Sequence, residues 1–220
     1  MPALRGSLTY ARFFVEGALP DDFRERFMRS VRLRAMRPLE PDDEELERSG
    51  WAKIGEPMQT DLSYEDVLWN EHVVLAFRTD RWQFPGAVVK ARMREAEAAY
   101  LQKKGRERLS RAEKNELKLM VTKRLRRTTS PATRAVDLSW ALGEGVVRFF
   151  SHASKPAAAM MELFKQTFGL TLVPESPYTL ATRLDLDRAE ARAWQDLART
   201  DLGDRGAAAE LEDAAAEEEE

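Results

Sequence analysis

The segment AVDLSWALGEGVVRFFSH, residues 135–152, places the strongest constraint on the fold of this chain. Val136, Leu138 and Trp140 alternate with polar residues, which is the period of a half-buried β-strand. A turn containing two glycines follows, and a second apolar run, 146–152, returns from it. Strands joined by so tight a turn are antiparallel. We therefore expect an α+β fold, with an antiparallel sheet and packed helices, rather than a doubly wound parallel sheet.

Further strands and helices are predicted around this hairpin. Segments rich in β-branched and aromatic residues indicate strands at 7–17, 72–80 and 170–178. Helical spacing of apolar residues indicates helices at about 20–34, 155–169 and 186–199. The acidic segment 38–50 is expected to be an exposed connection. Gly169 is the predicted C-cap of the helix at 155–169. The side chains expected to face inward from the last two helices are Met161, Phe164, Phe168, Leu186, Ala189, Ala193 and Leu197.

Two consecutive helices are predicted between residues 84 and 127. Phe84-Pro85-Gly86 begins the first. Its expected buried stripe consists of Val89, Met93, Ala96 and Tyr100. A glycine within KKGRER then interrupts the helix, and Ser110 followed by Glu113 has the spacing of a capping box at the start of a second helix. Such a pair forms an αα-hairpin.

Charge is strongly separated along the chain, although the net charge is only −3. Between Lys90 and Arg134, fifteen lysines and arginines stand against five glutamates. From Asp201 onward the sign reverses, with nine acidic residues and Arg205 as the single cation. Because local sign decides which partners a surface attracts, the basic block predicts a polyanionic partner. The acidic, alanine-rich tail at 203–220 is expected to be disordered, and it either competes with phosphate for the basic block or only raises solubility.

The second helix of the hairpin carries most of the candidate phosphate contacts. Arg111, Lys114 and Lys118 lie within about 60° of one another on an ideal helix, and Leu117, Met120 and Val121 are expected on an opposing, buried side. Four cations crowd the helix end, where the helix dipole accounts for one or two. The hydroxyl-rich TTSPATR is expected to be a loop that bonds phosphate oxygens without reading sequence. The predicted DNA-binding residues are Arg111, Lys114, Lys118, Lys123, Arg124, Arg126, Arg127 and Arg134.

Signatures of enzymes are absent or incomplete. The chain has no cysteine, which excludes disulfides, zinc–thiolate sites and cysteine nucleophiles, and it has no phosphate-loop or dinucleotide glycine motif. His72 and His152 lack companions at ligand spacing, and the acidic run 42–45 has no glycine-turned ligand loop and is interpreted as solvated. Glu116 and Lys118 match only the short half of a nuclease motif, in mid-helix. We expect no enzyme, no metal and no cofactor, with a divalent-dependent nuclease as the alternative to test.

The chain also lacks the signals of an exported or membrane protein. Its first residues contain no long apolar run with a small-residue cleavage site, and nowhere do about 18 uncharged apolar residues follow one another. We expect a cytoplasmic location and no membrane partner.

The order of these segments resembles the recombination-associated protein RdgC family. The resemblance runs through GWAKIG and HVVLAFR, the long stretch from FPGAVVKARMREAEAAY to KLMVTKRLRR, then AVDLSWALGEGVVRFFSH and LTLVPESP, and covers most of residues 7–180. It implies DNA binding without strong sequence preference, as a dimer closing into a ring with a basic inner surface. It also implies association with the nucleoid and restraint of the recombinase RecA by occupation of duplex DNA. The family's basic helix matches at Lys114, Lys118, Lys123, Arg124 and Arg127.

Two features depart from that family. Its members continue into a C-terminal α+β part that helps to close the ring, whereas residues 181–220 here offer a helix and an acidic tail. Its members also carry aromatic residues after the basic helix, near the dimer contact, where this chain has TTSPAT. We expect an RdgC-like DNA-binding domain at 1–180, a C-terminal helix at 181–202 and the tail at 203–220. The alternative function is a protein-interaction module that uses the charged hairpin and the acidic tail without binding DNA.

Overall fold

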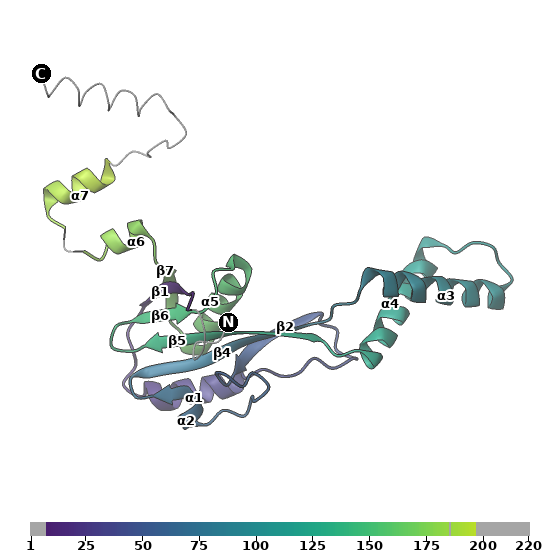
Figure 1. Cartoon of the computed structure of the whole chain (residues 1–220), viewed down its shortest axis with the longest axis horizontal. Coiled ribbons are helices and arrows are strands. Elements are labelled where there is room, and N and C mark those ends of the chain that lie inside the picture. The colour runs from purple at the N-terminus through teal and green to yellow at the C-terminus, as the bar shows by residue number, and fades with distance from the viewer. Residues whose placement is uncertain (1–7, 185, 197–220) are drawn as a thin grey trace, which may run out of the picture. The chain divides into compact units, whose positions relative to one another are not determined.

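An antiparallel sheet organises the computed structural model, in which residues 8–184 and 186–196 are described (Figure 1). The strands of this part of the chain are β1 (Ala11–Glu16), β2 (Glu47–Ala52), β3 (Leu68–Trp69), β4 (His72–Arg81), β5 (Ala132–Ala141), β6 (Val146–Phe149) and β7 (Thr171–Pro174). The helices are α1 (Phe23–Leu33), α2 (Tyr64–Val67), α3 (Gly86–Lys104), α4 (Arg111–Thr128), α5 (Ser154–Phe168), α6 (Pro177–Ala181) and α7 (Arg188–Gln195). The strand order is β2-β4-β5-β6-β1-β7, with β3 paired to β4, and the α+β prediction is confirmed.

Strands β5 and β6 form the hairpin predicted from the sequence. Their register places Trp140 opposite Val147, and Gly145 in the turn has a φ of 63°, a conformation that glycine adopts without strain. β5 also pairs along its whole length with β4, from His72 opposite Ala141 to Arg81 opposite Ala132. The predicted strands at 7–17 and 170–178 are present as the shorter β1 and β7. The long β4–β5 ribbon is therefore the centre of the sheet.

Helices α1 and α5 cover one face of this sheet. Phe27 of α1 and Phe168 of α5 lie with ring centroids 4.9 Å apart, and both rings contact Trp140 of β5. The indole N–H of Trp51 in β2 donates a 2.8 Å hydrogen bond to the Thr167 hydroxyl, so this buried polar group is satisfied. Large aromatic side chains removed from water in this way supply most of the stabilisation of a small core.

The predicted inward face of α5 needs one correction. Phe164 and Phe168 are buried as expected, and Gly169 caps the helix in the left-handed conformation. Met161, however, is only half-buried, and its neighbour Met160 is fully enclosed. Met160, Phe164 and Phe168 recur every four residues, so the stripe that faces the sheet starts one position earlier than predicted.

The opposite face of the ribbon holds a buried ion pair close to where the chain leaves for the helices. The Arg78 guanidinium donates two hydrogen bonds to Asp80, at 2.9 and 2.6 Å, and the Thr133 hydroxyl donates to the same carboxylate at 2.9 Å. Arg78 also donates to the carbonyl of Pro57. Because both charges have several partners, their burial is tolerated. Asp137 is likewise buried, although its place in the alternating pattern predicted an outward position.

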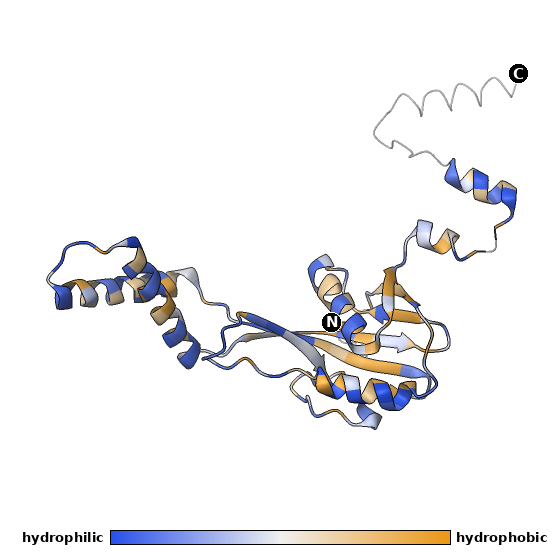
Figure 2. Cartoon of the chain, turned by 180° about the vertical axis from the view of Figure 1, so that it is seen from behind, coloured by the Kyte–Doolittle hydropathy of each residue, from blue (hydrophilic) through white to orange (hydrophobic). Residues whose placement is uncertain are grey.

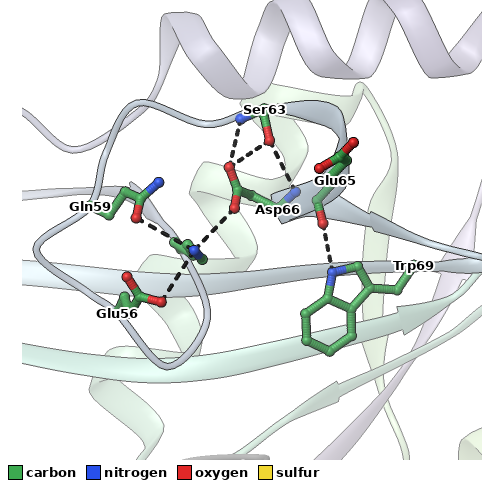
Figure 3. A network of polar contacts seen from close by, with 7 residues as sticks. Glu56, Gln59, Ser63, Glu65, Asp66 and Trp69 are labelled. Carbon is green, nitrogen blue, oxygen red and sulfur yellow. Dashed lines mark hydrogen bonds and ion pairs between the residues drawn. The ribbon is translucent and has the colours of Figure 1, made fainter.

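The segment 53–69 is closed by a polar network centred on Lys53 and Asp66 (Figure 3). The Lys53 ammonium lies 3.2 Å from Glu56 and 3.3 Å from Asp66. Asp66 also accepts from the backbone N–H and hydroxyl of Ser63, which caps α2. These hydrogen bonds, that from the Ser63 hydroxyl first, lower the pKa of Asp66. The loop is therefore an ordered part of the sheet edge.

The acidic segment expected to be an exposed connection is partly structured. Its last residues belong to β2, and Leu39 is buried. Gly50 approaches the backbone of Met36 so closely that a Cβ would stand 2.6 Å from the Met36 Cα. The Met36 N–H donates to the carbonyl of Trp51 at 2.7 Å, which fixes this approach. A glycine is thus required at position 50 for packing rather than for its φ angle.

Residues from Ser176 onward form a separate unit. In it, Ser176 caps α6 and Asp187 caps α7. The predicted helix at 186–199 is present as α7, but Ala189 and Ala193 are exposed rather than inward-facing. Leu197 and the tail at 203–220 lie outside the described residues. Among the helices that the structure describes, none is long and apolar enough to cross a membrane.

Candidate nucleic-acid interface

Helices α3 and α4 follow β4 and precede β5 in the chain, so they connect the two paired strands of the central ribbon (Figure 1). β4 ends at Arg81 and β5 begins at Ala132, and these two residues are paired across the ribbon. The chain therefore leaves the sheet and returns to it at one point, and the two predicted helices form the intervening segment. The part of the ribbon next to this point is more hydrophilic than the rest of it (Figure 2).

The two helices are joined by a capped turn. Gly105 ends α3 with a φ of 62°, and the Ser110 hydroxyl accepts from the Glu113 N–H, as the predicted capping box requires. Glu113 in turn accepts from the Tyr100 hydroxyl at 3.0 Å and from Arg106 at 3.2 Å. The backbone hydrogen bond from Ser110 is the largest cause of the lowered pKa of Glu113, and the hydrogen bond to Glu113 raises the pKa of Tyr100. One carboxylate thus holds both helices at the turn.

The buried side of α4 is narrower than predicted. Leu117 and Val121 are buried as expected, together with Leu125. Met120 is exposed over 57% of its surface, so its predicted inward position is wrong, and its neighbour Leu119 is 72% exposed. The predicted stripe of α3 is only half-buried, because α3 and α4 cover each other rather than the sheet.

Three of the predicted DNA-binding residues lie along the first half of α4. Arg111, Lys114 and Lys118 are exposed, and they form no ion pair with any residue of 8–184 or 186–196. Lys114 precedes Val121 by seven residues, so it projects within about 20° of it around the helix axis. These cations consequently extend and flank the buried stripe instead of opposing it. They present charge along the half of α4 that begins at the turn.

The cations at the end of α4 have partners within the chain. The Asp42 carboxylate lies 2.8 Å from the Lys123 ammonium and 3.2 Å from the Arg127 guanidinium. Hydrogen bonds from Lys123, and then from Arg127, lower the pKa of Asp42. The acidic run interpreted as solvated is therefore an internal partner of the basic helix, and we call residues 38–46 the acidic strap. No local sequence pattern indicates that pairing, although the opposite signs of the two runs are compatible with it.

Arg126 serves as an attachment of α4 to the rest of the molecule. It donates to the carbonyl of Asp43 in the acidic strap, and its guanidinium lies 5.9 Å from the centroid of the Trp82 ring. The side chain is half-buried. Trp82 itself was not among the predicted functional residues. These contacts make Arg126 the residue of the predicted set that is most engaged in packing.

Arg124 and Arg134 complete the predicted set. Both are exposed, and neither forms an ion pair with another described residue. Arg134 lies within β5, because the expected TTSPATR loop is wrong for residues 132–134, which pair with β4. The hydroxyls of Thr128 and Thr133 donate to the Leu125 carbonyl and to Asp80, so they are occupied within the chain.

Residues considered for catalysis or metal binding are scattered. Glu116 and Lys118 are exposed on either side of the buried Leu117, in the middle of α4. His72 begins β4 and His152 follows β6, both exposed. Across the described ranges, no group of three or more histidine, aspartate or glutamate side chains is arranged to hold a metal ion. The cations of the hairpin are thus the most distinctive chemical feature of this surface.

Comparison with known proteins adds no family assignment. No protein-family model matches the chain, and a search of the curated proteins finds no significant match.

Proposed function

We propose that this protein binds DNA through the phosphate backbone, without sequence preference and without catalysing a reaction. The observation that carries the proposal is that five cations of the predicted set, four on α4 and one on β5, are exposed and have no ion-pair partner among the described residues: Arg111, Lys114, Lys118, Arg124 and Arg134. Clustered cations gain affinity for a polyanion by releasing its condensed counterions. Lys123, Arg127 and Arg126 join this surface from the end of α4.

The position of the hairpin supports a role in holding a duplex. Both ends of the hairpin are fixed by the Arg81–Ala132 pair, and Arg126 ties its base to the acidic strap. A fixed cationic surface can follow a phosphate backbone, and contacts to phosphate carry no sequence information. The function would therefore rest on occupation of DNA, not on recognition of a site.

The sequence resemblance to the RdgC family extends the proposal to a pathway. On that basis the protein acts in recombination and replication, on the nucleoid, as a dimer that limits RecA-type strand exchange by occupying duplex DNA. The exposed side chains of Leu119 and Met120 offer apolar surface beside the cations, which suits a contact between two protein chains.

A duplex titration at several salt concentrations tests the DNA-binding proposal. Each phosphate contact contributes about 0.9 to the slope of log affinity against log salt, so changing Lys114 and Lys118 together to Ala should reduce that slope by roughly two. The matched control changes Arg26 and Arg29 of α1 to Ala, because both are exposed helical cations on another part of the molecule. Equal effects of the two double variants, or an affinity independent of salt, would contradict the proposal.

The protein-interaction module is the second candidate, and the exposure of Leu119 and Met120 favours it. In that case a partner protein should remain bound to the purified chain after nuclease treatment, and changing both residues to Ser should release it. If DNA binding is the function, the same double variant should keep its salt-dependent affinity for duplex DNA, because it retains every cation.

A further inference from the structure

A cavity of about 500 Å³ opens where the central ribbon meets the start of α5. It lies on the face of the ribbon that α5 covers, at the end nearest the hairpin. Its floor is formed by Phe77 and Val136, which are opposite each other in β4 and β5. Ala132 and, from α5, Pro156 and Ala159 form apolar walls. A cavity of this volume is within the usual range of about 300–1,000 Å³ for sites that hold small organic ligands.

The rim of this cavity is cationic. Arg81, Arg134 and Lys155 line it from β4, β5 and α5 respectively, together with Glu47 of β2. The Glu47 carboxylate lies 3.5 Å from Arg81 and 3.9 Å from Lys155, so one anion is shared between two cations. Arg134 has no ion-pair partner among the described residues. The rim therefore carries a surplus of two positive charges beside an apolar interior.

The start of α5 adds to this positive potential. Its N-cap, Ala153, offers no side-chain hydrogen bond, and the first turn contains no acidic residue. Pro156 has no backbone N–H, so Ser154 and Lys155 supply the free N–H groups at the start of the helix, and both residues line the cavity. Arg81 and Lys155 are also well exposed, at 59% and 78% of their side chains, so a ligand can reach them.

We infer that this cavity binds one unpaired nucleotide, with its phosphate at the Arg81–Arg134–Lys155 rim and its sugar and base against the apolar wall. An inorganic anion would need only the rim, whereas the apolar volume accommodates an organic body attached to the phosphate. The inference rests on the proposed DNA binding, because Arg134 belongs both to this rim and to the predicted DNA-binding set. A base inside a duplex is stacked and paired and cannot enter, so the site would favour DNA with a single-stranded extension.

Blocking the cavity without changing charge gives the sharpest test. Ala159→Phe places a ring in the cavity, whereas Ala158→Phe puts the same ring on an exposed position of α5 outside this cavity. The wild type should bind a duplex with a short single-stranded extension about tenfold more tightly than the blunt duplex, the ratio expected for one charge-assisted hydrogen bond. Ala159→Phe should abolish that preference, and Ala158→Phe should keep it.

The rim is tested by a matched pair of lysines on the same helix. Lys155→Ala should remove most of the preference for the extended duplex, whereas Lys165→Ala, at the other end of α5, should leave it unchanged. Free deoxyadenosine monophosphate should compete with the extension, and inorganic phosphate should compete only at higher concentration. Competition by the two at equal concentrations would mean that the site takes phosphate alone and would overturn the nucleotide assignment.

Failure of this inference can be separated from failure of the proposed function. If the wild type binds blunt and extended duplexes equally well, or if Ala159→Phe retains the preference, the cavity is not a nucleotide site although DNA binding stands. If the wild type binds no DNA, the proposed function fails. Calorimetric titration with the mononucleotide then decides the cavity alone: binding lost in Ala159→Phe and kept in Ala158→Phe supports it, and no binding to the wild type overturns it.

Discussion

The carboxylate of Asp42 stands 2.8 Å from the ammonium of Lys123, and the same carboxylate reaches Arg127 at 3.2 Å. Asp42 comes from the acidic strap and the two cations from the last turns of α4. All three side chains are largely exposed, so the ion pairs are weak and readily exchanged for another anion. Under the proposed function, the strap occupies the place of a phosphate until DNA displaces it.

Removing the charge of Asp42 should therefore tighten DNA binding. Asp42→Asn removes the carboxylate that competes with DNA phosphate for Lys123 and Arg127. We expect roughly threefold higher affinity for duplex DNA at low salt. Fluorescence anisotropy measures the effect. Glu44→Gln is the control. Glu44 is exposed on the same strap, and its change to Gln removes the same charge without removing an ion pair to α4. A similar gain in both variants would show that only net charge matters.

Changing Arg126 to Ala should mainly lower stability, whereas changing Arg124 to Ala should mainly lower DNA affinity. Arg126 packs over Trp82 and donates to the strap, so its loss should lower the free energy of unfolding by about 1–2 kcal/mol. Arg124 is exposed without an ion pair to the described residues, so its loss should lower DNA affinity and leave stability nearly unchanged. Urea denaturation together with the duplex titration separates the two roles. Equal destabilisation by both changes would contradict this division.

Gly50→Ala should destabilise the sheet edge. The added Cβ would meet the Met36 backbone at 2.6 Å, and a backbone cannot move aside as a flexible side chain does. We expect a loss of about 2 kcal/mol or more in the free energy of unfolding. Gly86→Ala provides the control, because a Cβ at that position meets nothing within 4 Å. Thermal unfolding of the two variants measures the contrast, and an unchanged melting temperature for Gly50→Ala would show that the contact is not tight.

The pH dependence of stability should reveal the capping carboxylate of Asp66. Its pKa is lowered in the folded chain by hydrogen bonds from Ser63 and by Lys53, so the folded state favours the charged form. That contribution is fully present above the pKa of an unfolded aspartate, near pH 4, and is lost as pH falls through the folded value. The wild type should exceed Asp66→Asn in stability at neutral pH, with the two converging in acid.

The control for that experiment is Asp61→Asn, since Asp61 is an exposed carboxylate in the same loop. Its difference from the wild type should be small at every pH. A difference between the wild type and Asp66→Asn that persists undiminished at pH 3 would indicate a packing role for Asp66 rather than an electrostatic one.

Local patterns explain which parts of the fold could be predicted from the sequence. The β5–β6 hairpin follows from the alternation around Leu138, and the start of α4 from the Ser110–Glu113 capping box, because both are set by neighbours in the chain. β2 was missed because ERSGWA has no regular alternation. It is a strand because Gly50 lets it lie against Met36 and because Ser49 and Trp51 pair with β4.

The candidate site could be predicted only in part, because local patterns do not show contacts between distant segments. Its cationic residues are visible in the sequence, but their partners are set by tertiary structure. Nothing near Asp42 indicates that it reaches Lys123, and nothing near Thr133 indicates that its hydroxyl belongs to Asp80. Met120 was misplaced because one helix packing on another covers a narrower stripe than a sheet does.

The pairing of Arg81 with Ala132 has a consequence for how this protein can change. The segment from residue 82 to residue 131 is connected to the sheet at two paired positions of one ribbon. The hydrogen bonds between β4 and β5 therefore do not depend on the length of that segment. Replacement of that stretch by a two-residue turn would leave the topology of the sheet intact. Mutation can therefore lengthen, recharge or reshape the inserted helices without changing the order of the strands in the sheet.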